Sequence, residues 1–258
     1  GGLTCFLSKS LNRQEILKCI RNRHHYASSG GPNGRPVINL NATFSNEGIL
    51  YHDDPRYIKN TGEKTNHALM GDIVKLSSGE MKISVEIFTS SSIERVEIFN
   101  GLELEETIKP YKKENIGKKI KLLWEGAEYR GRFREVIWDG KLNINGNSIL
   151  EVNPINFFNI DKNIIFKNSH ELEWKALTTG NFGGLEILLE NHMGGILNIN
   201  TPLINQKIDI NEIQFDDLKI ENNGNLPRFV RFFRIPEFNN FKNLKFERNV
   251  KLKENGDN

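Results

Sequence analysis

Two short groups of residues in this sequence have the side chains from which a metal or catalytic site could be built. His24-His25-Tyr26 precede a Ser/Gly-rich segment, and paired histidines in that position could bind a metal ion or an anion. The alternative is a cationic cap at the end of a helix. The second group, His52-Asp53-Asp54, offers metal-type ligands in a row. Consecutive residues seldom converge on one ion, so a solvated loop is the more common outcome for that group.

Two series of arginines could present guanidinium groups to an anion. Arg130, Arg132 and Arg134 alternate with other residues, which predicts three guanidinium groups on one face of a strand. A later series accompanies phenylalanines and consists of Arg228, Arg231 and Arg234. Such faces could hold phosphates, acidic sugars or a partner's carboxylates, and they could equally pair with glutamates on neighbouring strands.

Motifs that would define a complete catalytic site are missing from the sequence. It has no Gly-Lys-Ser/Thr phosphate loop, no Gly-x-Ser-x-Gly nucleophile elbow and no His-Glu-x-x-His. The glycines of residues 179–184 stand between two predicted strands, where a dinucleotide-binding fingerprint would need a helix, so they predict a strained turn. We therefore predict no catalytic residue set, no metal ligands and no cofactor in this chain.

Composition limits the partners and the compartment. Lys and Arg number 35 against 33 Asp and Glu, and a formal net charge of +2 makes nucleic acid an unexpected partner. No run approaches the ~18 apolar residues of a membrane span, and the first seven residues lack a basic leader. Two cysteines, Cys5 and Cys19, fit a reduced, cytoplasmic setting. Since the sequence does not begin with Met, we expect the chain to be part of a longer one.

The elements that would position these residues begin with one helix. Asn12 and Glu15 have the spacing of a capping box, and an apolar stripe follows them, which predicts a helix over residues 12–23. Residues 3–7 predict a short buried strand. The Ser/Gly/Pro-rich stretch at residues 28–34 cannot continue a regular element, so it marks a boundary.

Beyond that boundary the apolar period changes to two, which is typical of strands. Asn100-Gly101 and Asp139-Gly140 each separate alternating runs and predict hairpins. Residues 45–69 are polar and predict a long loop. Later strands are predicted at residues 172–176, 185–189, 208–213 and 229–235.

The fold class predicted from these signals is mainly β, with antiparallel β-sandwich modules preceded by a short strand and one α-helix. The predicted division is a strand–helix segment, a first β-sandwich module, a second β module and an extended or disordered tail, at residues 1–36, 37–145, 146–236 and 237–258.

Eight short patches between residue 1 and about residue 200 share a resemblance to one protein family. They are Gly-Gly-Leu-Thr at 1–4, Asn-Arg at 12–13, Arg-His-His-Tyr-Ala-Ser-Ser-Gly at 23–30, Met-Gly-Asp at 70–72, Ile-Glu-Arg-Val-Glu-Ile at 93–98, Trp-Glu-Gly-Ala-Glu-Tyr-Arg-Gly-Arg at 124–132, Trp-Asp-Gly at 138–140 and Thr-Thr-Gly-Asn-Phe-Gly-Gly at 178–184. These patches resemble the C-terminal part of an uncharacterised bacterial family built on the PHP (polymerase and histidinol phosphatase) metal-dependent hydrolase domain.

The resemblance implies that residues 1–30 are the closing strand and helix of a (β/α) metallo-hydrolase barrel, with residues 37–236 as its β-sandwich appendage. The His- and Asp-rich metal motifs of a PHP domain would lie upstream, so no metal ligand is carried over. A divalent metal and a barrel domain are expected only in a longer parent protein. The segment 23–29 would lie nearest the missing active site. With the first arginine series it supplies the candidate substrate-binding residues, which are His24, His25, Tyr26, Ser28, Arg130, Arg132 and Arg134.

Three hypotheses follow. The first is the C-terminal β portion of a PHP-like metal-dependent hydrolase, inactive alone. The second is a free-standing module that binds a carbohydrate or an anionic ligand, which Trp124, Trp138 and Trp174 on one open face would favour. The third is an independent enzyme that uses His24, His25, His52 and Asp53.

The first hypothesis predicts an uncovered apolar surface. A short strand and one amphipathic helix cannot bury their apolar sides by themselves. We therefore expect residues 1–30 to be packed on one side only, leaving a contiguous apolar patch formed by Leu3, Phe6, Leu7, Ile16, Leu17 and Ile20.

Overall fold

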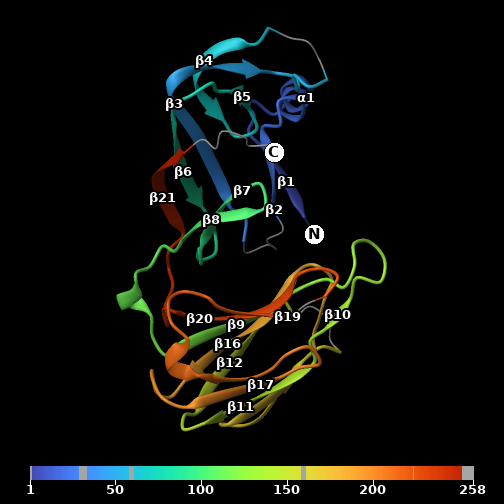
Figure 1. The fold of residues 1–258 in the computed structure, drawn as a ribbon, viewed down its shortest axis with the longest axis vertical. Helices are drawn as coiled ribbons and strands as arrows, with labels where there is room; N and C mark the ends of the chain where they lie inside the picture. The colour runs from blue at the N-terminus through green and yellow to red at the C-terminus, as the bar shows by residue number, and fades with distance from the viewer. Residues whose placement is uncertain (1, 29–33, 58–60, 158–160, 223, 252–258) are drawn as a thin grey trace. The chain divides into compact units, whose positions relative to one another are not determined.

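The chain folds as two compact units (Figure 1). This computed structural model describes residues 2–28, 34–57, 61–157, 161–222 and 224–251. Unit 1 contains residues 1–110 and 240–258, and unit 2 is the continuous segment 111–239. The predicted boundary between the β modules, after residue 145, differs from this division, which falls after residue 110. It differs because strands on both sides of residue 145 belong to one sandwich.

Unit 1 contains one helix and most of its strands lie in one antiparallel sheet. The sheet has the order β21-β6-β3-β4, with β5 also beside β3. Two further pairs, β1 with β2 and β7 with β8, are antiparallel. The bounds are β1 (Leu3–Phe6), α1 (Arg13–Arg21), β2 (His25–Ser28), β3 (Val37–Tyr51), β4 (Glu63–Leu69), β5 (Ile73–Lys75), β6 (Glu80–Phe88), β7 (Val96–Asn100), β8 (Glu103–Ile108) and β21 (Asn243–Lys251).

The predicted helix is confirmed. The Asn12 side chain accepts a hydrogen bond from the Glu15 backbone N–H at 2.9 Å, so Asn12 is the N-cap. The hairpin at Asn100-Gly101 is also present, and Asn100 pairs with Glu103. The predicted loop over residues 45–69 is wrong in part, because β3 continues to Tyr51 and β4 begins at Glu63.

The C-terminal strand β21 is an integral part of unit 1. It pairs with β6 from Asn243 opposite Phe88 to Lys251 opposite Glu80. Apolar side chains alternate along it and pack against the buried cluster of the sheet, namely Leu244, Phe246 and Val250. The tail was predicted to be extended or disordered, and from Asn243 to Lys251 it is extended. Residues 252–258 lie outside the described residues.

Unit 2 is a sandwich of two five-stranded sheets, which confirms the predicted fold class. One sheet has the order β13-β14-β11-β17-β18 and the other β12-β16-β9-β20-β19, with antiparallel neighbours throughout. The two layers are visible in Figure 1. The bounds are β9 (Lys119–Gly126), β10 (Val136–Ile137), β11 (Gly140–Asn145), β12 (Ile149–Ile155), β13 (Ile164–Asn168), β14 (Glu171–Trp174), β15 (Leu177–Thr178), β16 (Phe182–Leu189), β17 (Ile196–Asn200), β18 (Asn205–Asp209), β19 (Leu218–Asn222) and β20 (Arg228–Ile235), with 3-10 turns at η1 (Lys113–Asn115) and η2 (Ile210–Glu212).

The three tryptophans form part of the core between these sheets. Trp124 stacks on Trp174 with ring centroids 5.3 Å apart. The Trp174 indole N–H donates to the Trp138 carbonyl at 2.6 Å, and the Trp138 indole N–H donates to the Thr178 hydroxyl at 2.9 Å. All three side chains are buried, so they do not form the open aromatic face that would have favoured carbohydrate stacking.

The predicted hairpin at Asp139-Gly140 is wrong. β10 pairs with β15, whereas β11 pairs with β14 and β17. The chain therefore passes from one sheet to another at this point. A Cβ on Gly140 would lie 2.6 Å from the Trp174 ring, so glycine is needed here for close packing rather than for a turn.

Because unit 2 is continuous and has its own core, we expect residues 111–239 to fold when expressed alone. All three tryptophans lie in this unit, so their fluorescence during urea unfolding reports on it selectively. The fragment should unfold cooperatively at a midpoint close to that of the full chain.

The converse is expected for unit 1. A chain of residues 1–110 lacks β21 and leaves β6 with an unpaired edge, so it should not give a cooperative transition by circular dichroism. A non-cooperative unit 2 fragment, or a stable 1–110 fragment, would contradict this division.

Candidate functional site

The first group of predicted residues lies where the end of the helix meets the main sheet of unit 1. The His24 imidazole Nε2 lies 2.8 Å from Asp72 Oδ1. The other oxygen of Asp72 accepts a hydrogen bond from the Leu69 backbone N–H at 2.8 Å. The Arg23 guanidinium Nε donates to the Gly71 carbonyl at 2.8 Å. Two of the sequence patches, 23–30 and 70–72, are therefore in contact through these bonds, which fasten the strand–helix segment to the sheet.

This contact depends on backbone geometry that glycine permits. Gly71 has φ +93°, and a Cβ at that position would lie 2.2 Å from the Arg23 carbonyl oxygen. Arg23 itself has φ +60°. The chain reverses at Arg23, so that His24 and the strand β2 can return beside β1.

The other predicted residues of this group do not converge on a common point. On β2 successive side chains point to opposite faces, which separates His25 from Tyr26 and Ser28. The Tyr26 hydroxyl donates to the Pro36 carbonyl at 2.8 Å and accepts from the Ile38 N–H at 3.1 Å. Burial is the main cause that raises the pKa of Tyr26, which favours the protonated donor.

Two atoms on β2 are buried without a hydrogen-bond partner within the described part of the chain, His25 Nδ1 and Ser28 Oγ. His25 packs on the Phe6 ring at 5.8 Å between centroids. Of the four predicted binding residues, His24 thus bonds to the turn before β5, whereas His25, Tyr26 and Ser28 lie on the strand that pairs with β1.

The predicted strand that would align the first arginine series is wrong. Arg130, Arg132 and Arg134 are all exposed in an irregular loop between β9 and β10. Gly131 at φ +89° and Phe133 at φ +57° interrupt the extended backbone that a strand requires.

For two of the three arginines in the second series the structure confirms the ion-pair interpretation. Arg228 pairs with Glu128, and Arg231 pairs with Glu125 and, at 3.4 Å, with Asp217. Arg234 is fully buried and donates to the carbonyls of residues Ile213, Gly117 and Ile210, at 2.7, 3.1 and 3.2 Å. Burial lowers the pKa of Arg234, and the three carbonyls replace part of its lost hydration.

The group His52-Asp53-Asp54 does not form a site either. His52 Nε2 lies 3.7 Å from Glu63 Oε1, and Asp54 pairs with Arg56 at 2.8 Å. The hydrogen bonds from Arg56 lower the pKa of the Asp54 carboxyl. Across the residues that the structure describes, no three His, Cys, Asp or Glu side chains are grouped so that they could hold a metal ion.

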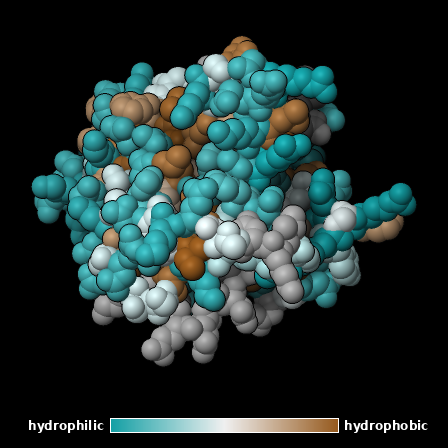
Figure 2. All heavy atoms as spheres, turned by 90° about the horizontal axis from the view of Figure 1, so that it is seen from above, coloured by the Kyte–Doolittle hydropathy of each residue, from teal (hydrophilic) through white to brown (hydrophobic). Residues whose placement is uncertain are grey.

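The apolar side chains of the strand–helix segment are exposed as expected, and β1, predicted as a buried strand, has no fully buried residue. Leu3 and Phe6 point to opposite faces of β1, so the exposed side chains do not all lie on one side of the segment. Five of the six predicted side chains are exposed, and Ile16 is half-buried. Leu17 and Ile20, one helical turn apart on α1, are 42% and 48% exposed, whereas Cys19 on the opposite side is buried. Figure 2 shows hydrophobic side chains reaching the surface among hydrophilic ones on the face it views.

The strand in this segment also has an open edge. β1 pairs with β2 on one side, and in the described residues no strand lies on its other side. We call the five exposed side chains together with this edge the strand–helix face; its side chains are Leu3, Phe6, Leu7, Leu17 and Ile20.

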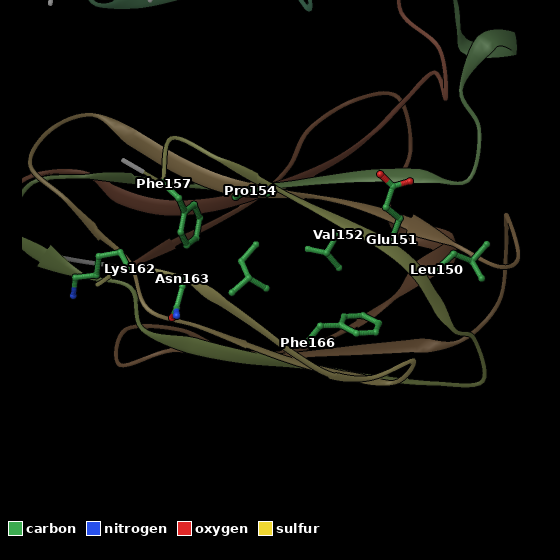
Figure 3. A pocket seen from close by; sticks show the side chains of 9 residues that line it. Leu150, Glu151, Val152, Pro154, Phe157, Lys162, Asn163 and Phe166 are labelled. Atoms are coloured by element: carbon green, nitrogen blue, oxygen red, sulfur yellow. The ribbon is translucent and has the colours of Figure 1, made fainter. Parts of the chain in front are cut away.

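In unit 2 a cleft of about 470 Å³ opens at one edge of the sandwich, between β12 and β13 (Figure 3). Its walls are mostly apolar, and Val152, Phe157 and Phe166 are among the side chains drawn there. Phe157 meets Trp124 edge-on at 6.0 Å. No residue predicted as a candidate site lines this cleft.

Comparisons with protein-family models, with curated proteins and with solved structures gave no match. Among the described residues there is no helix with the length and apolar character needed to cross a membrane.

Asp72→Ala should destabilise unit 1 by about 1–3 kcal/mol, because two donors, His24 Nε2 and the Leu69 N–H, lose their acceptor. Hydrogen exchange followed by mass spectrometry should show faster exchange over residues 66–72. Asp53→Ala, at an exposed position in the same unit, is the matched control and should change stability by less than about 0.5 kcal/mol. Equal effects of the two substitutions would contradict this role of Asp72.

Proposed function

We propose that this chain is the C-terminal β portion of a PHP-like metal-dependent hydrolase, and that the strand–helix face is where the barrel domain packs. The observation that carries the proposal is the exposure of five large apolar side chains on one short strand, the residue that follows it and one helix. Apolar area left exposed on so small a segment favours burial against a partner.

The open edge of β1 supports the same partner. An unpaired strand edge presents backbone N–H and C=O groups that another strand can satisfy. β1 and β2 run antiparallel, unlike neighbouring strands of a (β/α) barrel, which run parallel. In this proposal β2 therefore belongs with the appendage, and the free edge of β1 faces the barrel.

The clamp between the two sequence patches gives this face a fixed orientation. His24 with Asp72, and Arg23 with Gly71, tie the end of α1 to the turn before β5. Apolar side chains on a rigidly held element lose less conformational freedom on docking than those on a loose one. The role of these residues is then positioning, while the divalent metal and its ligands belong to the barrel domain.

We expect this chain alone to lack phosphoesterase activity, because in its described residues no three His, Cys, Asp or Glu side chains are grouped to hold a metal that would activate water. The purified chain should contain less than one zinc, iron or manganese per molecule by elemental analysis. Metal-dependent hydrolysis of a generic phosphoester that is lost in His24→Ala or His52→Ala would refute this and favour an independent enzyme.

The surface role of Leu17 and Ile20 can be tested by substitution. Leu17→Gln with Ile20→Gln should leave the stability of this chain within about 0.5 kcal/mol, because the side chains are exposed. Ile83→Gln, in the buried cluster of unit 1, is the control and should cost several kcal/mol.

In a longer chain that includes the upstream coding sequence, the same double substitution should lower the midpoint of thermal unfolding. It should also increase the rate at which the barrel domain is cleaved in limited proteolysis. An upstream sequence without His- and Asp-rich metal motifs, or an unchanged longer chain, would overturn the proposal.

A further inference from the structure

The outer face of the β11-β17-β18 part of the sandwich has an unusual set of side chains. Core residues such as Leu142, Ile144, Leu197 and Ile199 point inward from β11 and β17, so the residues between them point outward. Five of these outward residues on the three strands are asparagines, here called the amide face: Asn143, Asn145, Asn198, Asn200 and Asn205. They line a shallow hollow of about 800 Å³.

The strand register brings these amides into rows. Asn143 lies opposite Asn198, which lies opposite Lys207. In the next row Asn200 lies between Lys141 and Asn205. Directly opposite side chains in a sheet are close enough to interact, but within the described residues these amides form no hydrogen bonds with one another.

Asn198, at the centre, has an unsatisfied acceptor. Its Oδ1 is buried and has no hydrogen-bond partner within the described part of the chain. A buried amide oxygen without a donor costs about 1–3 kcal/mol, and asparagine is also disfavoured in strands. Neighbouring side chains cover this oxygen, so a ligand on the face reaches it only after one of them moves aside.

The chemistry of this face selects a hydroxyl-rich ligand. Each amide offers two donors and one acceptor, which matches hydroxyl groups that both donate and accept. Ile196, 39% exposed within the hollow, can contact the C–H surface of a sugar ring. The face has no exposed aromatic ring among its lining residues, which single-stranded nucleic acids would need for base stacking.

The charges on the face are nearly balanced. Lys141 and Lys207 flank the amides, and Asp209 lies beside Ile196. Asp209 accepts a hydrogen bond from the Asn211 N–H at 2.8 Å. Two lysines against one carboxylate give no dense cationic cluster of the kind that binds phosphates.

We propose that the amide face binds a neutral oligosaccharide, with Asn198 and Asn143 as its central hydrogen-bonding residues. The proposal concerns unit 2 and is independent of the strand–helix face of unit 1. Failure of one proposal therefore leaves the other intact.

The full chain is first screened on a glycan array that covers neutral, amino and acidic oligosaccharides. The strongest neutral oligosaccharide is then titrated by calorimetry against the wild-type chain and against Asn198→Val. We expect the substitution to weaken binding by about tenfold or more, since a buried hydrogen bond is lost. Asn153→Val, on β12 of the other sheet, is the matched control and should bind as the wild type does.

A second readout separates binding from structure. Valine is favoured in strands and needs no hydrogen bond, so Asn198→Val should keep or raise the urea midpoint followed by tryptophan fluorescence. Asn200→Ala, at an exposed position, is a second variant that should weaken binding without unfolding.

Any one of four results would overturn the proposal. The first three are no neutral oligosaccharide bound on the array, equal binding by Asn198→Val and Asn153→Val, and a lower urea midpoint of Asn198→Val with binding unchanged in Asn200→Ala. Binding that is confined to acidic sugars and is lost at high salt would assign the face to the lysines instead and would also overturn it.

Discussion

The organisation of the chain depends on the antiparallel pairing of β6 with β21. These strands lie on either side of unit 2 in the sequence, and their register extends over nine residue pairs. The entropic cost of closing a long loop grows only slowly with its length, and unit 2 has a core of its own, so the intervening chain does not prevent this pairing. Unit 1 is complete only when the last described strand has paired, although its helix and clamp lie near the beginning of the sequence.

Elements governed by near neighbours could be predicted from the sequence. The N-cap at Asn12 and the alternating burial along β6 depend on residues a few positions apart. The predictions that failed depend on distant residues. Gly140 is required because the Trp174 ring occupies the space of its Cβ, and nothing within a few residues of Gly140 reveals this. The boundary after residue 110 could not be predicted for the same reason, since it follows from the pairing of β6 with β21.

The candidate surfaces were predictable to different degrees. The strand–helix face was predicted because a nine-residue helix and a four-residue strand have too few residues to cover their own apolar sides. The amide face was missed, because asparagines in β11, β17 and β18 are far apart in the sequence and only the register brings them together. A signal was present in the alternation of Asn with Leu or Ile along β11 and β17. The general abundance of asparagine in the sequence obscured that signal.

The strand–helix face and the amide face would bind through different kinds of interaction. The strand–helix face exposes apolar area, for which burial against another apolar surface is favourable and largely non-directional. The amide face has directional donors and acceptors, including one buried oxygen that has no hydrogen-bond partner among the described residues. By contrast, most of the histidines and arginines that were considered for a functional site each bond to a partner within the fold. His24 is held by Asp72, Arg228 and Arg231 by carboxylates, and Arg234 by three carbonyls. A nucleophile or general base must be within reach of a reacting group and not committed to the fold. Within the described residues, His24, Arg228, Arg231 and Arg234 are therefore committed to holding the fold together.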